Sequence, residues 1–178
     1  MAAVLGLDDD QVETACSDVD GDVWVANFNA PGQVVIAGSP DGIERAGLVA
    51  KELGAKRIVP VAVSGAFHTP FMADARDRLD AALATARFDN AAIPVSANVD
   101  ALPHTDAADW RALMAAQLCS PVRWRQTIRN LADDGVTIFV ELGPGKVLTG
   151  TVKRTLRDSQ QLAVASPDDL DGLLQAVS

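Results

Sequence analysis

The composition of this chain indicates a folded, globular protein: it has 178 residues, of which 48% are hydrophobic and 22% are charged. Its net charge of −9 argues against binding to nucleic acid, because phosphates require clustered cations. Its longest apolar runs, such as residues 58–63, have the length of strands and not the roughly 20 residues of a membrane span, so we predict no membrane association. Cys16 and Cys119 show no CxxC spacing, which is typical of thiols kept reduced in the cytoplasm.

The first 64 residues alternate short apolar strands with two amphipathic helices. The turn NAPG joins two apolar runs into a hairpin, and Ser39 before Pro40 is a typical helix cap followed by a proline in the first turn. The predicted strands cover 1–7, 23–28, 33–37 and 56–64, and the predicted helices cover 8–19 and 40–54. This βαββαβ order is that of a ferredoxin-like unit, in which both helices pack on one face of an antiparallel sheet.

The second half of the chain has many predicted helices and few strands. The helices cover 70–86, 106–118 and 122–132, another begins near 146, and the segment 168–176 closes the chain. The only strands predicted are 93–97 and 137–142, and the latter has the continuous apolar character of a parallel strand buried on both faces. Two strands do not complete such a sheet. We therefore expect either that further strands come from a segment outside this chain or that this half covers another protein. Apolar side chains along both strands are then expected to be exposed.

The two histidines of the chain stand in different contexts. His104 lies in the polar stretch LPHTDA, which predicts a solvated position on the surface. His68 lies between the strand IVPVAVS and a helix that opens at Pro70, a junction at which α/β proteins often place their sites. Gly65 and Ala66 allow a substrate or another backbone to approach closely. Position alone leaves two roles open for His68, a hydrogen-bonded structural residue or a general base near neutral pH.

No nucleophile for such a base is evident in the sequence. The GxSxG pattern, which exposes a serine on a sharp strand-to-helix turn, is absent, and Cys119 is predicted to be a buried thiol at a helix end. The stretch TIFVELGPGKVLTG departs from the phosphate-binding loop motif at Val140 and Val147, so we predict a tight Gly-Pro-Gly turn there. No cluster of His, Cys or carboxylates has the spacing of metal ligands, and no metal site is predicted.

Three amide side chains, those of Asn27, Asn29 and Gln33, lie close together in the hairpin NFNAPGQVVIAG. Turn chemistry alone explains amides at these positions. Beside a cleft, the same amides would hydrogen-bond a polar ligand rich in amides, such as pantetheine. Both interpretations remain open on the residues alone.

Several of these segments carry a family resemblance that extends through nearly the whole chain. In order, the segments are MAAVLGL, NFNAPGQVVIAG, VSGAFHTPFM, IPVSANVDA, QLCSPVRW and ELGPGKVLTGTVKR. They resemble the malonyl-CoA:acyl carrier protein transacylases of fatty-acid synthesis and the related acyltransferase domains of polyketide synthases. The resemblance implies an α/β protein, with residues 1–64 as its ferredoxin-like small subdomain. Residues 65–178 would be the C-terminal part of its α/β-hydrolase-like large subdomain.

The resemblance also implies roles for individual residues. The histidine of SGAFH, His68, matches the catalytic base of the family. Gln117, which opens QLCSPVRW, matches the residue whose backbone carbonyl orients that histidine, in place of the aspartate of a Ser-His-Asp triad. Phe67, in a GAFH similar to the HAFH of malonyl-specific acyltransferases, favours malonyl over methylmalonyl substrates. Asn27, Asn29 and Gln33 become candidates for binding the substrate or its CoA portion.

Three features of the family have no counterpart in this sequence. They are a Gly-Gln-Gly oxyanion segment, a GHSxGE nucleophile elbow and an arginine that binds the malonyl carboxylate, and in the family all three precede the point that matches Met1. We therefore expect a C-terminal portion of such an enzyme, with the missing strands in the absent N-terminal half. This portion is expected to be inactive by itself, because the covalent route requires the nucleophile.

The implied activity is ping-pong transfer of a malonyl group from malonyl-CoA to the phosphopantetheine thiol of acyl carrier protein. No cofactor is implied, and the implied partners are the two substrates and the missing half of the enzyme. One alternative is a ferredoxin-like binding or scaffold protein without catalysis. Another is a split enzyme that is completed by a second chain.

Overall fold

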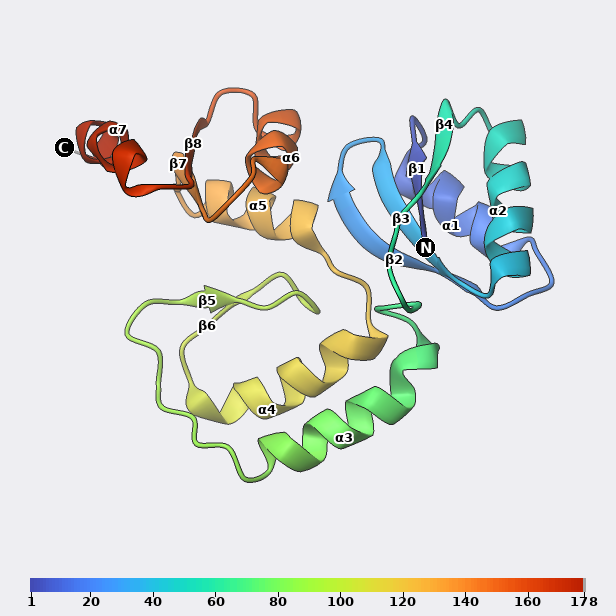
Figure 1. Ribbon diagram of the computed structural model, residues 1–178, viewed down its shortest axis with the longest axis horizontal. Helices are drawn as coiled ribbons and strands as arrows, with labels where there is room; N and C mark the ends of the chain where they lie inside the picture. Colours follow the sequence, from blue (N-terminus) through green and yellow to red (C-terminus); the bar gives the residue numbers. More distant parts are fainter. Residues whose placement is uncertain (178) are drawn as a thin grey trace. The chain divides into compact units, whose positions relative to one another are not determined.

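The computed structural model describes residues 1–177 of the chain. Contacts divide it into two compact units, Met1–Thr127 and Ile128–Ser178, which are described in turn. Helices and strands are mixed throughout, as the predicted α/β class requires (Figure 1). None of the helices in the described chain has both the length and the hydropathy that crossing a membrane requires.

The first unit begins with a four-stranded antiparallel sheet. Its strands are β1 (Ala2–Leu5), β2 (Val23–Ala30), β3 (Gln33–Gly38) and β4 (Arg57–Pro60), in the order β2-β3-β1-β4. Two helices, α1 (Asp9–Ser17) and α2 (Pro40–Glu52), connect β1 to β2 and β3 to β4. The predicted βαββαβ order is confirmed, and the strand order is that of a ferredoxin-like sheet. The subdomain boundary at residue 64 stays a prediction.

Local sequence explains where both of these helices begin. Asp8 accepts a hydrogen bond from the backbone N–H of Gln11, whose side chain accepts one from the backbone N–H of Asp8, so the two form a capping box. Ser39 accepts a hydrogen bond from the N–H of Gly42 at 3.0 Å, and Pro40 occupies the first helical position. Such caps satisfy backbone donors that have no partner inside the helix.

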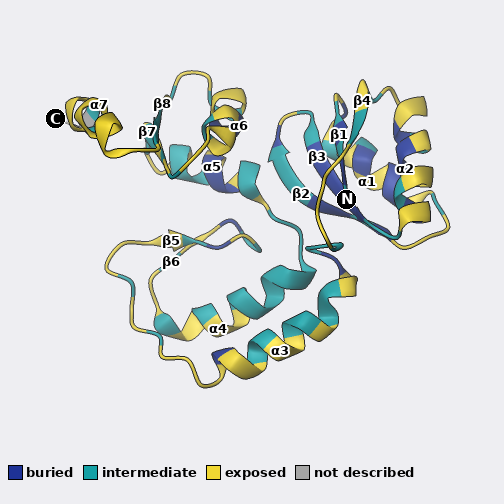
Figure 2. Cartoon of the chain, in the orientation of Figure 1, coloured by how far each residue is buried: buried dark blue, intermediate teal, exposed yellow. Residues whose placement is uncertain are grey.

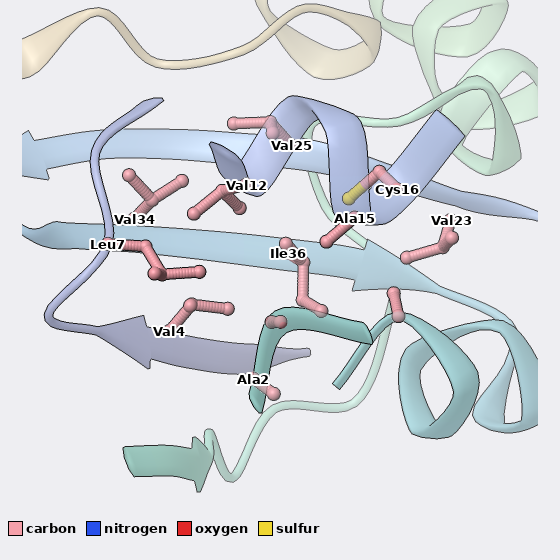
Figure 3. Packing of buried hydrophobic residues seen from close by; sticks show 12 residues of the cluster. Ala2, Val4, Leu7, Val12, Ala15, Cys16, Val23, Val25, Val34 and Ile36 are labelled. Carbon is pink, nitrogen blue, oxygen red and sulfur yellow. The ribbon is translucent and has the colours of Figure 1, made fainter. Parts of the chain in front are cut away.

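The core of this sheet lies between the strands and the two helices. Alternate strand residues face the helices, and Figure 3 shows Val12 and Ala15 of α1 facing Val34 and Ile36 of β3. Gly38 ends β3 where a side chain would collide with the Asp22 carbonyl oxygen, so only glycine fits there.

The predicted fourth strand was too long. Strand pairing ends at Pro60, and residues 61–69 form an irregular segment in which Val61 and Val63 are exposed. The N–H of Val61 still donates to the Met1 carbonyl at 3.0 Å, but β1, the strand beside β4, begins at Ala2, so the rest of the apolar run VAV has no ladder to join. The shorter strand brings the irregular segment, which contains His68, to the end of the sheet.

Short helices and one small hairpin make up the rest of the first unit. The elements are η1 (Pro70–Met72), α3 (Ala73–Leu83), β5 (Val95–Ser96), β6 (Pro103–His104), α4 (Ala107–Ala116), η2 (Gln117–Cys119) and the start of α5 (Trp124–Asp133). Helices α3 and α4 lie side by side (Figure 1). The strand predicted over 93–97 is only two residues long and pairs with β6. Pro94, which lacks an N–H, and the turn after Ser96 limit its length.

The second unit contains a parallel pair of strands that the sequence prediction missed in part. Strand β7 (Ile138–Leu142) was expected, whereas β8 (Gln160–Val164), which pairs with it in parallel, was not. The remaining elements are α6 (Val147–Thr155), η3 (Pro167–Asp169) and α7 (Leu170–Val177).

Apolar side chains are exposed at both strands where exposure was expected. Ile93 is 77% exposed and Leu142 75% exposed, and Val95 and Val140 are exposed as well. Figure 2 shows the stretch between α3 and β5 coloured largely as exposed. This part of the prediction is confirmed, although Ala97 at the end of the first strand is buried.

Candidate active site

His68 stands in a strained loop between β4 and η1. Its φ angle is +64°, in the left-handed region that a residue with a side chain occupies at a cost of about 1–2 kcal/mol. The fully buried Thr69 holds the loop: its hydroxyl donates to the Ala66 carbonyl at 2.6 Å and accepts from the Phe71 N–H at 3.3 Å. The Thr-Pro pair after the histidine is thus the cap of η1.

The ring of His68 is oriented by a residue 49 positions later in the chain. Its Nδ1 lies 2.8 Å from the backbone carbonyl oxygen of Gln117. A carbonyl oxygen only accepts, so Nδ1 must carry the proton in this hydrogen bond. In the neutral ring, Nε2 is then the nitrogen with a free lone pair and is able to accept a proton.

Strand β2 holds the segment that carries Gln117. The N–H of Val122 donates to the Ala26 carbonyl at 2.8 Å, and the N–H of Phe28 donates to the Val122 carbonyl at 2.9 Å. These two bonds form a parallel bridge at Asn27, where β2 has a bulge. Bulges re-aim the backbone next to sites, and here the bulge lies beside the connection to Gln117.

A cavity of about 590 Å³ lies in the first unit beside His68. Its walls come from α1, β2, the loop of His68 and the end of η2 with the residues after it. The lining residues include Cys16, Trp24, Phe28, His68, Cys119 and Pro121. Burial, with a smaller contribution from Glu13, raises the pKa of the Cys16 thiol to about 12. Cys16 is therefore a protonated, unreactive thiol at neutral pH. No lysine or arginine is among the described residues that line the cavity.

The structure brings together only some of the predicted site residues. His68 and Gln117 are in contact. Asn27 and Asn29 lie in β2 and Gln33 begins β3, and none of the three is among the described residues that line the cavity. The Phe67 ring lies against Gly65, where an added Cβ would be 3.6 Å from it.

Two contacts near His68 were not anticipated from the sequence. Asn98 Nδ2 donates to Gln117 Oε1 at 3.2 Å, which adds a side-chain bond to the residue that orients His68. Trp24 and Phe71 form an edge-to-face pair with ring centroids 5.3 Å apart. Among the structural features around His68, only the Thr-Pro pair could have been identified from the sequence, because this pattern is typical of a helix cap.

The predicted solvated position of His104 is wrong. Its side chain is only 16% exposed and lies between two carboxylates, with Nδ1 3.1 Å from Asp109 and Nε2 3.0 Å from Asp100. The hydrogen bond to Asp109, and then that to Asp100, raises the pKa of His104 above its usual value. The ring also meets Trp110 edge to face. All three partners of His104 lie within six positions of it along the chain. Their side chains come together around His104 because of the β5–β6 hairpin.

The Gly-Pro-Gly segment of the second unit does not leave a free helix end for a phosphate. The Glu141 carboxylate accepts hydrogen bonds from the hydroxyl and the N–H of Thr149 and from the N–H of Leu148, at the start of α6. These bonds, with the Thr149 hydroxyl first, lower the pKa of Glu141. In the described part of the chain, no group of three or more His, Cys, Asp or Glu residues is arranged to hold a metal ion.

The family to which this chain belongs follows from comparison of the whole sequence. The family model of the acyl transferase domain matches residues 1–169. The chain is therefore a member of the acyl transferase domain family, which agrees with its mixed helix and sheet fold and with the resemblance found in its motifs.

Within this family the chain is similar to malonyl CoA-acyl carrier protein transacylases. It is 41% identical to that of Bacillus subtilis over 180 residues, covering 99% of this chain and 57% of the relative. With that of Haemophilus influenzae it shares 43% identity over 166 residues, covering 92% and 53%. The chain thus spans a little over half the length of these relatives.

Solved structures give the same result. The acyl carrier protein S-malonyltransferase of Vibrio cholerae superposes with a TM-score of 0.93 at 42% identity, covering 97% of this chain and 57% of that one. A malonyl-transacylase in complex with a type II polyketide synthase acyl carrier protein superposes with a TM-score of 0.95 at 38% identity, covering 98% and 57%.

Proposed function

We propose that this chain supplies the general base, His68, of a malonyl-CoA:acyl carrier protein transacylase. It works together with a segment that carries the nucleophilic serine, the oxyanion donors and the carboxylate-binding arginine. The observation that carries the proposal is the 2.8 Å contact between His68 Nδ1 and the Gln117 carbonyl, because it leaves Nε2 as the proton acceptor.

In the first half of the reaction, Nε2 of His68 takes the proton of the serine hydroxyl. The serine oxygen attacks the thioester carbonyl of malonyl-CoA, and the C–S bond breaks to give a malonyl ester of the serine. The imidazolium then returns its proton to the departing CoA thiolate. Throughout, the Gln117 carbonyl stabilises the positive charge of the ring, as the third member of the arrangement.

The second half reverses these steps with a different thiol. His68 takes the proton of the phosphopantetheine thiol of acyl carrier protein, and the sulfur attacks the malonyl ester. The serine oxygen leaves and receives the proton back from His68. A malonyl-transacylase relative has been solved in complex with an acyl carrier protein, which supports acyl carrier protein as the acceptor.

The surroundings of His68 agree with a site that this sequence supplies only in part. The described lining of the cavity beside His68 contains no cation for a malonyl carboxylate, and its buried thiol Cys16 is protonated. The missing groups therefore come from the complementing segment. Asn27, Asn29 and Gln33 on the hairpin are proposed to bind the pantetheine amides, and Phe67 to favour malonyl over methylmalonyl.

The experiment is reconstitution with the part of a bacterial relative that precedes the matched region and contains its GHSxGE motif. The two polypeptides are mixed with labelled malonyl-CoA and phosphopantetheinylated acyl carrier protein, and label on the carrier protein is counted. We expect transfer with the pair and none with this chain alone. In the pair, His68→Ala lowers the rate by about 10²–10⁴-fold, the usual contribution of a general base.

A matched control changes an exposed carboxylate of the first unit, Glu52→Gln at the end of α2, and is expected to transfer at the unmodified rate. Complex formation without transfer would contradict the catalytic proposal and favour a binding role for the chain. Transfer that survives His68→Ala would remove His68 as the base.

A further inference from the structure

Two residues with side chains adopt left-handed backbone conformations in the described part of the chain, and both belong to loops that contact Gln117. One is His68, with φ +64°, whose ring meets the Gln117 carbonyl. The other is Ala101, with φ +63°, in the turn that also contains Asn98. Strained backbone persists only where the surrounding structure holds it, and it concentrates at sites. The two strained loops therefore converge on one residue.

Asn98 makes a hydrogen bond to each end of the segment 117–123. Its Nδ2 donates to Gln117 Oε1 at 3.2 Å, and its backbone carbonyl accepts from the N–H of Arg123 at 2.9 Å. Between these two points, Val122 is bonded to the edge of β2. The segment that contains Gln117 is thus held from the side of Asn98 as well as from the side of β2.

The turn that presents Asn98 is itself tightly bonded. The N–H of Ala97 donates to the Leu102 carbonyl and the N–H of Ala101 to the Ala97 carbonyl, both at 3.0 Å. The N–H of Leu102 donates to the Asp100 carboxylate, which also binds His104. Ala97 and Ala101 are buried, whereas the Asn98 side chain is exposed and makes its hydrogen bond to Gln117. These hydrogen bonds hold the turn so that the side-chain amide of Asn98 is directed toward Gln117.

From this juxtaposition we infer that Asn98 is a positioning residue for the reaction. It orients the side chain and hence the backbone of Gln117, and through the Gln117 carbonyl it keeps the proton of His68 on Nδ1. The inference rests on the proposed function, in which His68 Nε2 is the base. Asn98 itself touches no reacting atom.

The first test measures the ring of His68 without any activity. In the chain labelled with ¹⁵N at histidine, the ratio of the two neutral tautomers of His68 is read by NMR above the titration range of the ring. Only two histidines are present, and a His68→Gln sample identifies the signals. We expect Asn98→Ala to raise the proportion of the Nε2–H tautomer by about 2- to 10-fold, the effect of losing one net hydrogen bond.

A second variant removes the same hydrogen bond by changing Gln117 instead of Asn98. Gln117→Met removes Oε1, keeps nearly the same length of side chain and leaves the backbone carbonyl in place. We expect the same change in the tautomer ratio, and no further change in the double variant, since both substitutions remove one interaction. Gln160→Ala, which changes an exposed amide of the second unit, serves as the control and is expected to leave the ratio unchanged.

The second test uses the reconstituted pair of polypeptides. Asn98→Ala is expected to lower kcat by up to about 2-fold with little change in KM, because it reduces the fraction of His68 in the reactive tautomer while that tautomer stays the major one. A folded Asn98→Ala chain with an unaltered tautomer ratio would overturn the inference, and so would a kcat loss in Asn98→Ala that Gln117→Met does not reproduce. If the ratio moves as expected but the unmodified pair transfers no malonyl group, the proposed function fails while the positioning of His68 by Asn98 stands.

Discussion

The sheet of residues 2–60 and the parallel strand pair of residues 138–164 bury their apolar residues to very different extents. In the first, Val4, Val34 and Ile36 are essentially inaccessible, and two helices cover one face of four strands. In the second, the sheet has only two strands, which α6 contacts, and Leu142 and Val147 are each 75% exposed. An antiparallel sheet covered on one face is a stable arrangement, whereas parallel strands are found with both faces covered. The described residues of this chain therefore bury the first region well and leave apolar side chains of the second exposed.

The largest expected effect tests this contrast by truncating one side chain in each region. Ile36→Ala leaves a cavity in the packed core and is expected to lower the free energy of unfolding by about 2–5 kcal/mol. Leu142→Ala removes a side chain that water already surrounds and is expected to change it by less than about 0.5 kcal/mol. Urea unfolding followed by circular dichroism measures both. Equal losses would show that Leu142 is packed and would break the comparison.

A smaller effect concerns His104, whose charge stabilises the hairpin of the first unit. Contact with Asp109 and Asp100 raises its pKa in the folded chain, so the stabilisation is fully present below the unfolded pKa. It is lost as the pH rises through the folded pKa. His104→Gln is expected to lower Tm by about 2–4 °C at pH 5 and by less at pH 8.

Calorimetry at the two pH values measures this difference. Asp89→Asn, which changes a carboxylate on the surface of the same unit, is the control and is expected to show no such pH dependence. A Tm loss that is larger at pH 8 than at pH 5 would contradict the assignment of a charged His104.

The smallest expected effect concerns Glu141 in the second unit, whose contribution to stability depends on pH in the opposite direction to that of His104. Hydrogen bonds from Thr149 and Leu148 lower the pKa of Glu141, so its contribution is present above the unfolded pKa and is lost as the pH falls through the folded pKa. Glu141→Gln is expected to speed hydrogen exchange at the amides of Leu148 and Thr149 at neutral pH, and to leave the first unit unaffected. NMR-detected exchange measures this, and equal rates in the two proteins would show that the carboxylate does not cap α6.

Much of the first unit was predictable because its determinants are local. Asp8, Ser39 and Pro40 mark helix starts by bonds or steric limits within three residues of themselves. The apolar runs of β2 and β3 flank a Pro-Gly turn, so their pairing follows from a short loop. The prediction was wrong where a distant partner decides, as for β8, whose residues became a strand by pairing with β7.

The candidate site was predictable only as separate parts. The motif around His68 identified a candidate base by resemblance, but its position alone was also compatible with a structural histidine. His104 was placed in solvent because its neighbours along the chain are polar, although those same neighbours enclose it.

The sequence by itself determined the helix caps, the hairpin, the order of the elements in the first 60 residues and the family. Each of these depends on residues within a few positions of one another, or on motifs that can be recognised directly. Tertiary structure alone decided that Nδ1 of His68 would meet the carbonyl of Gln117, 49 residues away, and that Asn98 would bind the same residue. The physical reason is that such bonds form only when distant segments have been brought together by packing, which also supports the strained backbone of His68 and Ala101.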